Sequence, residues 1–166
     1  ESLIGIVLPD GIKEIEAHLF NGCTSLKDVK LPSEARRIHQ WAFRNCTSLE
    51  RIILPGKLEM IDSEAFQNCS ALTSITIPET VREIRSSAFE GCTNLRELVV
   101  QGKDTKIIDD NRWMRLGSGK DTVYSLMPYQ SGFEDCREFV IIGHAGSPAQ
   151  EYAESRSFLF RDIQSA

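Results

Sequence analysis

The chain of 166 residues lacks several features that would assign it to a common functional class. Basic residues are not in excess, because 19 Lys and Arg stand against 24 Asp and Glu and give a net charge of -5. Nucleic-acid-binding domains gather Lys and Arg on one face. No apolar run approaches the ~20 residues that a membrane helix needs. We therefore expect neither a nucleic-acid partner nor a membrane span within this chain.

Signatures of catalysis and metal binding are missing as well. The sequence contains no Gly-x-Ser-x-Gly, His-Glu-x-x-His, phosphate-binding glycine loop or Cys-x-x-Cys pair. Its histidines, His18, His39 and His144, share no repeat position, and acidic pairs such as Asp109 and Asp110 are explained more simply as surface and turn residues. The sequence therefore predicts no enzyme activity, no metal and no cofactor.

What the sequence does contain is a repeat of 23 residues. Each recurring cysteine has a phenylalanine three positions before it and a leucine three positions after it, and prolines keep the same phase. The cysteines are Cys23, Cys46, Cys69 and Cys92, and the phenylalanines are Phe20, Phe43, Phe66 and Phe89. A period of roughly 20–50 residues that several positions keep in phase predicts a solenoid of stacked repeats.

Each repeat contains one segment with the period of a half-buried strand. In residues 26–32, Val29 and Leu31 alternate with polar Asp28 and Lys30 before a proline ends the segment. Such strands stack into a parallel sheet. The chain must then return, and we expect a short strand or helical turn there that points Ile38, Ala42 and Phe43 inward. The following corners suit a left-handed backbone at Gly22, Asn45, Asn68 and Gly91.

The cysteines fit a ladder of reduced, buried thiols better than a disulfide framework. There are five of them, an odd number, and their spacing is even, whereas disulfides need pairs. Cysteine behaves as a small buried hydrophobe, and a residue at one repeat position stacks on its copies. A disulfide or a bound metal is the alternative.

The period fails once, after Val100. Arg112 and Arg115 stand where phenylalanine and cysteine are due, and the phase recovers only at Phe133 and Cys136. We therefore predict three parts. These are 23-residue repeats in 1–107 with the first one truncated, an insertion in 108–132, and a final repeat with a C-terminal cap in 133–166. Because Leu3, Ile6, Leu8 and Pro9 match only the second half of a repeat, the sequence is expected to be part of a longer protein.

The predicted insertion and cap carry different signals. Insertions in repeat proteins often lie on a binding face, so Trp113, Tyr124 and Tyr129 are weaker contact candidates, unless they only pack on the end of the sheet. In the cap, Ser147, Pro148 and Gln150 form the start of a helix over 148–156 that should bury Tyr152 and Ala153. Phe158, Phe160 and Ile163 then predict a closing strand.

The motif Leu-x-x-Val-x-Leu-Pro, with Ile six residues on and then Ala-Phe-x-x-Cys-x-x-Leu, resembles the BspA-like, treponemal-type leucine-rich repeat. One copy consists of Leu49, Ile52, Leu54, Pro55, Ile61, Ala65, Phe66, Cys69 and Leu72. The resemblance covers residues 3 to about 107 and resumes from Phe133. It implies a leucine-rich repeat solenoid of stacked short parallel strands with irregular or short-strand returns and a C-terminal helix-plus-strand cap. It also implies an extracellular or cell-surface location, since the family is largely bacterial surface or secreted proteins, some implicated in adhesion.

Binding is expected on the outward face of the predicted sheet. One outward column is Gly5, Asp28, Arg51, Ser74 and Glu97, and the next is Val7, Lys30, Ile53, Thr76 and Val99. The second column turns apolar side chains toward water, which indicates a contact site or an ordinary surface. The contact candidates are Lys30, Arg51, Ile53, Thr76, Glu97 and Val99.

The function predicted on this resemblance is a non-enzymatic recognition or adhesion module. Its partner would be a host or bacterial surface protein, or a glycan, bound through the exposed sheet face. The alternative is a structural spacer array in a larger surface protein, and a weaker one is a binding domain of a larger enzyme.

Overall fold

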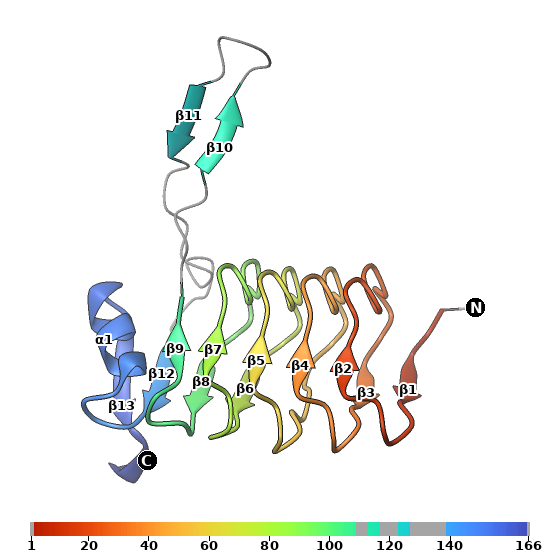
Figure 1. The fold of residues 1–166 in the computed structure, drawn as a ribbon, viewed down its shortest axis with the longest axis horizontal. Coiled ribbons are helices and arrows are strands. Elements are labelled where there is room, and N and C mark those ends of the chain that lie inside the picture. Colours follow the sequence, from red (N-terminus) through yellow and green to blue (C-terminus); the bar gives the residue numbers. More distant parts are fainter. Residues whose placement is uncertain (1, 109–112, 117–122, 127–138, 166) are drawn as a thin grey trace.

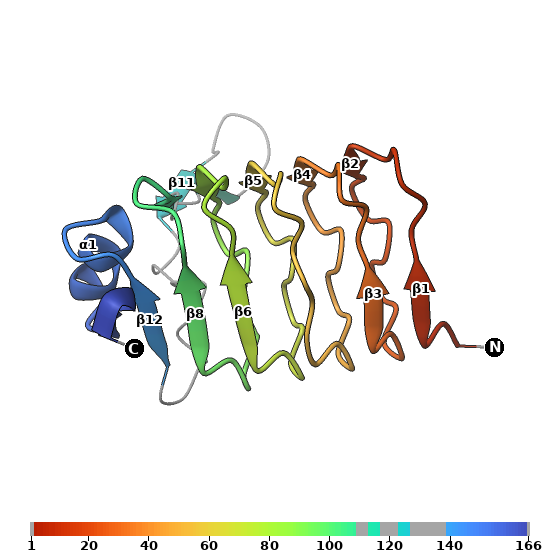
Figure 2. The same cartoon turned by 90° about the horizontal axis from the view of Figure 1, so that it is seen from below.

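The computed structural model of the protein describes residues 2–108, 113–116, 123–126 and 139–165. The chain winds into a solenoid whose turns, here called rungs, each follow the 23-residue repeat. Successive rungs place their strands side by side in two parallel sheets on different sides of the solenoid (Figures 1 and 2). The predicted fold, a leucine-rich repeat solenoid of short parallel strands, is therefore confirmed.

The first sheet consists of the longer strands. It has two parts that are hydrogen-bonded separately, which we call together the first sheet. One part is β1 (Gly5–Val7) with β3 (Asp28–Lys30), and the other is β6 (Ser74–Ile77), β8 (Glu97–Val100), β12 (Val140–Gly143) and β13 (Leu159–Asp162). Neighbouring rungs pair in the register of the repeat, so that Ile6 lies opposite Val29. The third rung departs from the expected regularity, because it pairs only through a single bridge between Lys30 and Ile53. Among the described strands, β6 pairs with β8 and not with this third rung.

The second sheet forms the return side of each rung. It contains β2 (Glu14–Ile15), β4 (Arg37–Ile38), β5 (Met60–Ile61), β7 (Glu83–Ile84) and β9 (Lys106–Ile107), in that order. Ile38 lies between Ile15 and Ile61 in register. Ile38, Ala42 and Phe43 are fully buried, as the sequence predicts. The return is thus a two-residue strand followed by turns.

Identical residues stack on one another in the core between the sheets. The rings of Phe43 and Phe66 are parallel within 3°, with centroids 5.1 Å apart. The thiol of Cys46 donates a hydrogen bond of 3.2 Å to the carbonyl of Phe20, and Cys69 and Cys92 repeat this bond one rung later each. Burial raises the pKa of Cys46 to about 12, so this thiol stays protonated at neutral pH.

No disulfide joins two of the described cysteines. Cys46, Cys69 and Cys92 are buried as predicted, whereas Cys23 in the first rung is only half-buried. Cys136 lies outside the described residues. Within the described chain, the ladder therefore consists of reduced thiols.

Two corners of each rung have a left-handed backbone. Gly22, Asn45, Asn68 and Gly91 have φ between 61° and 78°, as the sequence predicts. The repeat pattern did not predict the second corner. There, φ lies between 56° and 62° although the residues are not glycine: they are His18, Trp41, Glu64 and Ser87. The indole Nε1 of Trp41 donates to Glu64 Oε2 at 2.9 Å, which links two of these strained positions.

A helix and a strand close the C-terminal end, as predicted. The helix α1 (Pro148–Ser155) begins at Ser147, whose hydroxyl accepts from the amide of Gln150 at 3.4 Å. The Gln150 side-chain oxygen accepts a hydrogen bond from the Gly146 amide. Tyr152 and Ala153 are buried, and β13 follows. The predicted last strand ends earlier than expected, because Ile163 begins a short 3₁₀ helix, η2 (Ile163–Ser165).

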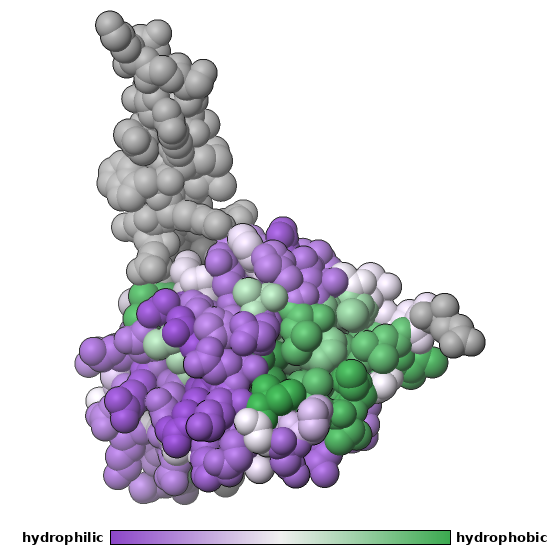
Figure 3. Space-filling view, turned by 45° about the vertical axis from the view of Figure 1, so that its right-hand side comes forward, coloured by the Kyte–Doolittle hydropathy of each residue, from purple (hydrophilic) through white to green (hydrophobic). Residues whose placement is uncertain are grey.

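The opposite end of the solenoid has no such cover among the described residues. Figure 3 shows apolar side chains gathered at this end, where Leu3, Ile4, Val7 and Leu19 are exposed. Within the insertion, β10 (Trp113–Leu116) and β11 (Val123–Leu126) form an antiparallel pair. The predicted boundaries of the three parts stay predictions.

Candidate functional site

The outward face of the first sheet exposes apolar side chains. Ile53 is 85% exposed and Val7 is 69% exposed, although both are on strands or bridges of the sheet. Their neighbours along the chain, Ile52 and Ile6, point inward. The alternation predicted from the sequence is therefore present, and it leaves an aliphatic side chain in water on the third rung.

A trough of about 760 Å³ lies on this face around Ile53. Its sides are residues 28–33 of the second rung and 51–56 of the third. The floor is aliphatic: Leu31, Ile52 and Leu54 are 7–8% exposed, whereas Ile75 and Leu98 on the next rungs are 0–2% exposed. The inward side chains below the trough are thus closer to water than those of the two rungs that follow.

The charged groups of the trough are unpaired. Asp28, Lys30 and Arg51 are exposed, and among the described residues none of them takes part in an ion pair. Lys30 lies opposite Ile53 in the bridge, and Arg51 precedes Ile53 by two residues. A cation therefore flanks the exposed isoleucine on two sides.

The structure gathers only some of the predicted contact residues. Lys30, Arg51 and Ile53 line the trough together. Thr76, Glu97 and Val99 lie on the same sheet in β6 and β8, but do not line the trough, and Val99 is half-buried. Of the insertion candidates, Trp113 and Tyr124 lie in β10 and β11, and Tyr129 lies outside the described residues.

The residues at the end of the trough were not among the predicted contacts. Ser33, Pro55 and Gly56 line it where the strands turn. A usable signal was present, because Ser33 and Gly56 are small residues at the repeat position that Glu79 occupies one rung later. Small side chains at successive copies of one turn position leave room above the floor.

The outward side of the second sheet has a different character. On this sheet and in the turns that lead into it, charges of opposite sign pair between neighbouring rungs: Lys57 Nζ lies 2.7 Å from Glu34 in the turns, and Arg36 pairs with Glu59 just before the strands. The hydrogen bond from Lys57 is the main cause that lowers the pKa of Glu34. His39 likewise lies 2.7 Å from Glu14. This side satisfies many of its own charges.

Asp62 is a buried carboxylate on this side, with two arginine partners. It accepts from Arg37 at 2.7 Å, from Arg85 at 3.3 Å and from the Ser63 amide at 3.1 Å. Burial by itself would raise the pKa of Asp62, but these hydrogen bonds and the two positive charges outweigh it. The pKa of Asp62 is therefore below its ordinary value of 3.8, and the group stays ionised.

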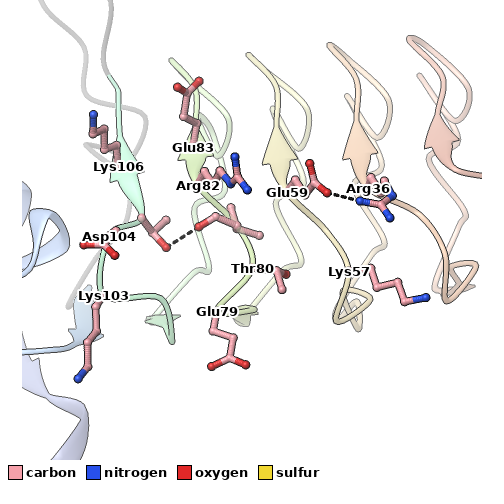
Figure 4. Close-up of a pocket in the computed structure, with 12 residues that line it drawn as sticks. Arg36, Lys57, Glu59, Glu79, Thr80, Arg82, Glu83, Lys103, Asp104 and Lys106 are labelled. Carbon is pink, nitrogen blue, oxygen red and sulfur yellow. Dashed lines mark hydrogen bonds and ion pairs between the residues drawn. The ribbon is translucent and has the colours of Figure 1, made fainter.

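A second hollow, of about 800 Å³, lies on this charged side. Figure 4 shows that its long side chains diverge: Glu83 and Lys106 point to one edge of the hollow, and Glu79 and Lys103 point to the other. Positive and negative groups alternate along it. Because the charges neither converge nor share one sign, this hollow is a weaker candidate for binding than the trough.

The described part of the chain shows no arrangement of side chains typical of metal binding or catalysis. No group of three or more His, Cys, Asp and Glu among the described residues is placed to hold a metal ion. His144 Nε2 lies 2.9 Å from the carbonyl of Gln101, and His18 packs on Trp41 with ring centroids 4.6 Å apart. Within the described residues, no helix has the length and apolar character for crossing a bilayer.

This stacked-rung fold with its exposed sheet face defines a leucine-rich repeat protein. The model of the BspA type leucine rich repeat region matches residues 1–114 in six copies. The chain belongs to this family.

Solved structures agree on the fold. The chain is similar to a leucine rich repeat protein from T. pallidum, with 24% identity over 66% of this chain and 70% of that one and a TM-score of 0.53. It is also similar to the pneumococcal vaccine antigen PcpA, with 19% identity over 96% of this chain, 40% of that one and a TM-score of 0.64. This chain thus spans less than half of the pneumococcal protein. No curated protein matches the sequence.

Proposed function

We propose that the chain is a non-enzymatic recognition module of a bacterial surface or secreted protein, and that it binds a protein partner through the outward face of the first sheet. The observation that carries this proposal is the trough, where Lys30 and Arg51 flank the exposed Ile53 without an ion pair to any described residue. Interfaces combine an apolar centre with charged groups at the rim.

The family and the shape of the solenoid support the same proposal. Solenoids present extended surfaces that suit macromolecular partners better than small molecules. A surface location is supported by the family and by the likeness in fold to a protein named as a vaccine antigen. Arg51, Ile53 and Lys30 are the central contacts of the proposal, and Thr76, Glu97 and Val99 extend the face.

The test compares two double variants of the purified chain. The first, Arg51→Glu with Ile53→Asp, reverses a charge and removes the apolar centre of the trough. The matched control, Arg82→Glu with Leu19→Asp, makes similar changes away from the first sheet, at an exposed arginine of the second sheet and at a leucine that is 46% exposed in the turns after β2. Binding to immobilised extracellular-matrix proteins and to whole bacterial and host cells is then measured.

The trough variant should bind at least tenfold more weakly than the wild type, and the control should bind as the wild type does. Equal binding by the trough variant would refute the proposed face. An absence of binding to the whole panel would favour a structural spacer, and binding lost only after periodate treatment of the partner would favour a glycan.

A further inference from the structure

The trough on the first sheet is elongated along the direction of the strands. Its two sides, residues 28–33 and 51–56, are stretches of chain that run alongside each other from strand into turn. Before the turns, residues 28–31 and 51–54 would span about 13 Å at the rise of a strand, whereas neighbouring strands are only about 4.8 Å apart. The trough is therefore long in the direction of the strands and narrow across them, which is the shape of an extended chain.

The spacing of its contact groups follows the strand period. Arg51 and Ile53 are two residues apart and both are exposed on the same face. Residues two apart in an extended chain are separated by about 6.6–6.8 Å and point to the same side. A second extended chain lying along the trough has the same period, so its residues i and i+2 can meet Arg51 and Ile53 together.

The net positive charge of the trough favours a negatively charged ligand. Lys30 and Arg51 are two cations against one anion, Asp28, and no described residue forms an ion pair with any of them. Guanidinium binds carboxylate in a bidentate geometry, which fixes orientation as well as charge. The lining has no aromatic side chain on which a sugar ring would stack. An acidic polypeptide fits these features better than a basic one or a glycan.

We propose that this trough binds an extended polypeptide segment in which an acidic residue and a large aliphatic residue are two positions apart. The carboxylate pairs with Arg51, the aliphatic side chain covers Ile53, and Lys30 holds a further carboxylate of the segment. This inference rests on the proposed function, because it names the chemistry of the partner at the same face.

The experiment uses short peptides and the ¹⁵N-labelled chain. The matched probe is acetyl-Gly-Glu-Ser-Leu-Ser-Gly-amide, in which Glu and Leu are two positions apart. The control probe, acetyl-Gly-Glu-Leu-Ser-Ser-Gly-amide, has the same composition but places Glu and Leu on opposite sides of an extended chain. A third probe replaces Glu of the matched peptide with Lys. Amide shifts are followed during titration at low and at high salt.

The matched probe should shift amides in 28–33 and 51–56 and bind at least threefold more tightly than the control probe. Arg51→Glu should weaken it at least tenfold, whereas Arg82→Glu on the second sheet should leave its affinity unchanged. The lysine probe should not bind, and higher salt should weaken the matched probe because exposed charges are screened.

Equal affinity for the two spacings, or shifts confined to another face, would overturn the inference. Its failure can be told from failure of the proposed function. If no peptide binds but the trough double variant still loses its panel partner, the face is correct and the extended acidic segment is wrong. If neither peptides nor panel depend on the trough, both proposals fail.

Discussion

The two sheets of the solenoid differ in whether their charged side chains form ion pairs. On the second sheet, acids and bases at equivalent turns meet one rung apart, as Arg36 meets Glu59 and Lys57 meets Glu34. Around the trough of the first sheet, Lys30 and Arg51 have no ion-pair partner among the described residues, and Ile53 is exposed beside them. A face whose charges neutralise one another contributes to stability, whereas a face with unpaired charges is available to a partner.

The largest expected effect is a difference in stability between substitutions on the inward and the outward side of the third rung. Ile52→Ala should destabilise the chain by about 2–4 kcal/mol, because Ile52 is 7% exposed and its loss leaves a cavity. Ile53→Ala, the matched control, should change the free energy of unfolding by less than about 0.5 kcal/mol, since that side chain is 85% exposed. Denaturant unfolding monitored by circular dichroism measures both. Similar losses would mean that Ile53 packs against the fold and is not free for a partner.

The next effect tests whether the second sheet stabilises itself by charge. Asp62→Asn should cost about 1 kcal/mol at pH 7, since it weakens hydrogen bonds from Arg37 and Arg85 at a partly screened site. Because the pKa of Asp62 is lowered on folding, this contribution is present above the ordinary value of 3.8 and is lost as pH falls through the folded pKa.

Urea unfolding of both chains from pH 7 downward measures this dependence. The stabilities of wild type and Asp62→Asn should converge in acid. A difference that persists unchanged to pH 2 would show that the carboxylate charge is not its cause.

The sequence predicts what repeats, and it does so well. Ile38, Phe43 and Cys46 are buried because residues in one phase must stack, and the helix start at Ser147 follows from local capping chemistry. The interrupted pairing beside Ile53 has no counterpart in the period, because periodicity fixes which side chains point inward but not how closely two rungs approach. For the same reason the exposed column could be predicted and the trough could not. Whether its residues bind a partner stays a prediction.

A smaller effect is expected from one exposed pair on the second sheet. A double-mutant cycle of Arg36→Ala and Glu59→Ala should give a coupling of about 0.3–0.5 kcal/mol, because both side chains are around half exposed. The coupling should fall at 1 M salt, where the screening length is about 3 Å. If no coupling is measured at low salt, the Arg36–Glu59 pair does not stabilise the second sheet. The argument that paired charges stabilise this sheet would then depend mainly on Asp62.

The smallest effect on stability is expected for Arg51 on the first sheet. Arg51→Ala should change the free energy of unfolding by less than about 0.5 kcal/mol, since the guanidinium is exposed and no described residue forms an ion pair with it. The same substitution should still weaken partner binding, because the Arg51 charge contributes to contacts with the partner and not to the stability of the chain. Thermal unfolding with and without partner separates these roles. A loss of stability without a loss of binding would place Arg51 in the same structural role as the arginines of the second sheet and end the distinction between the two faces.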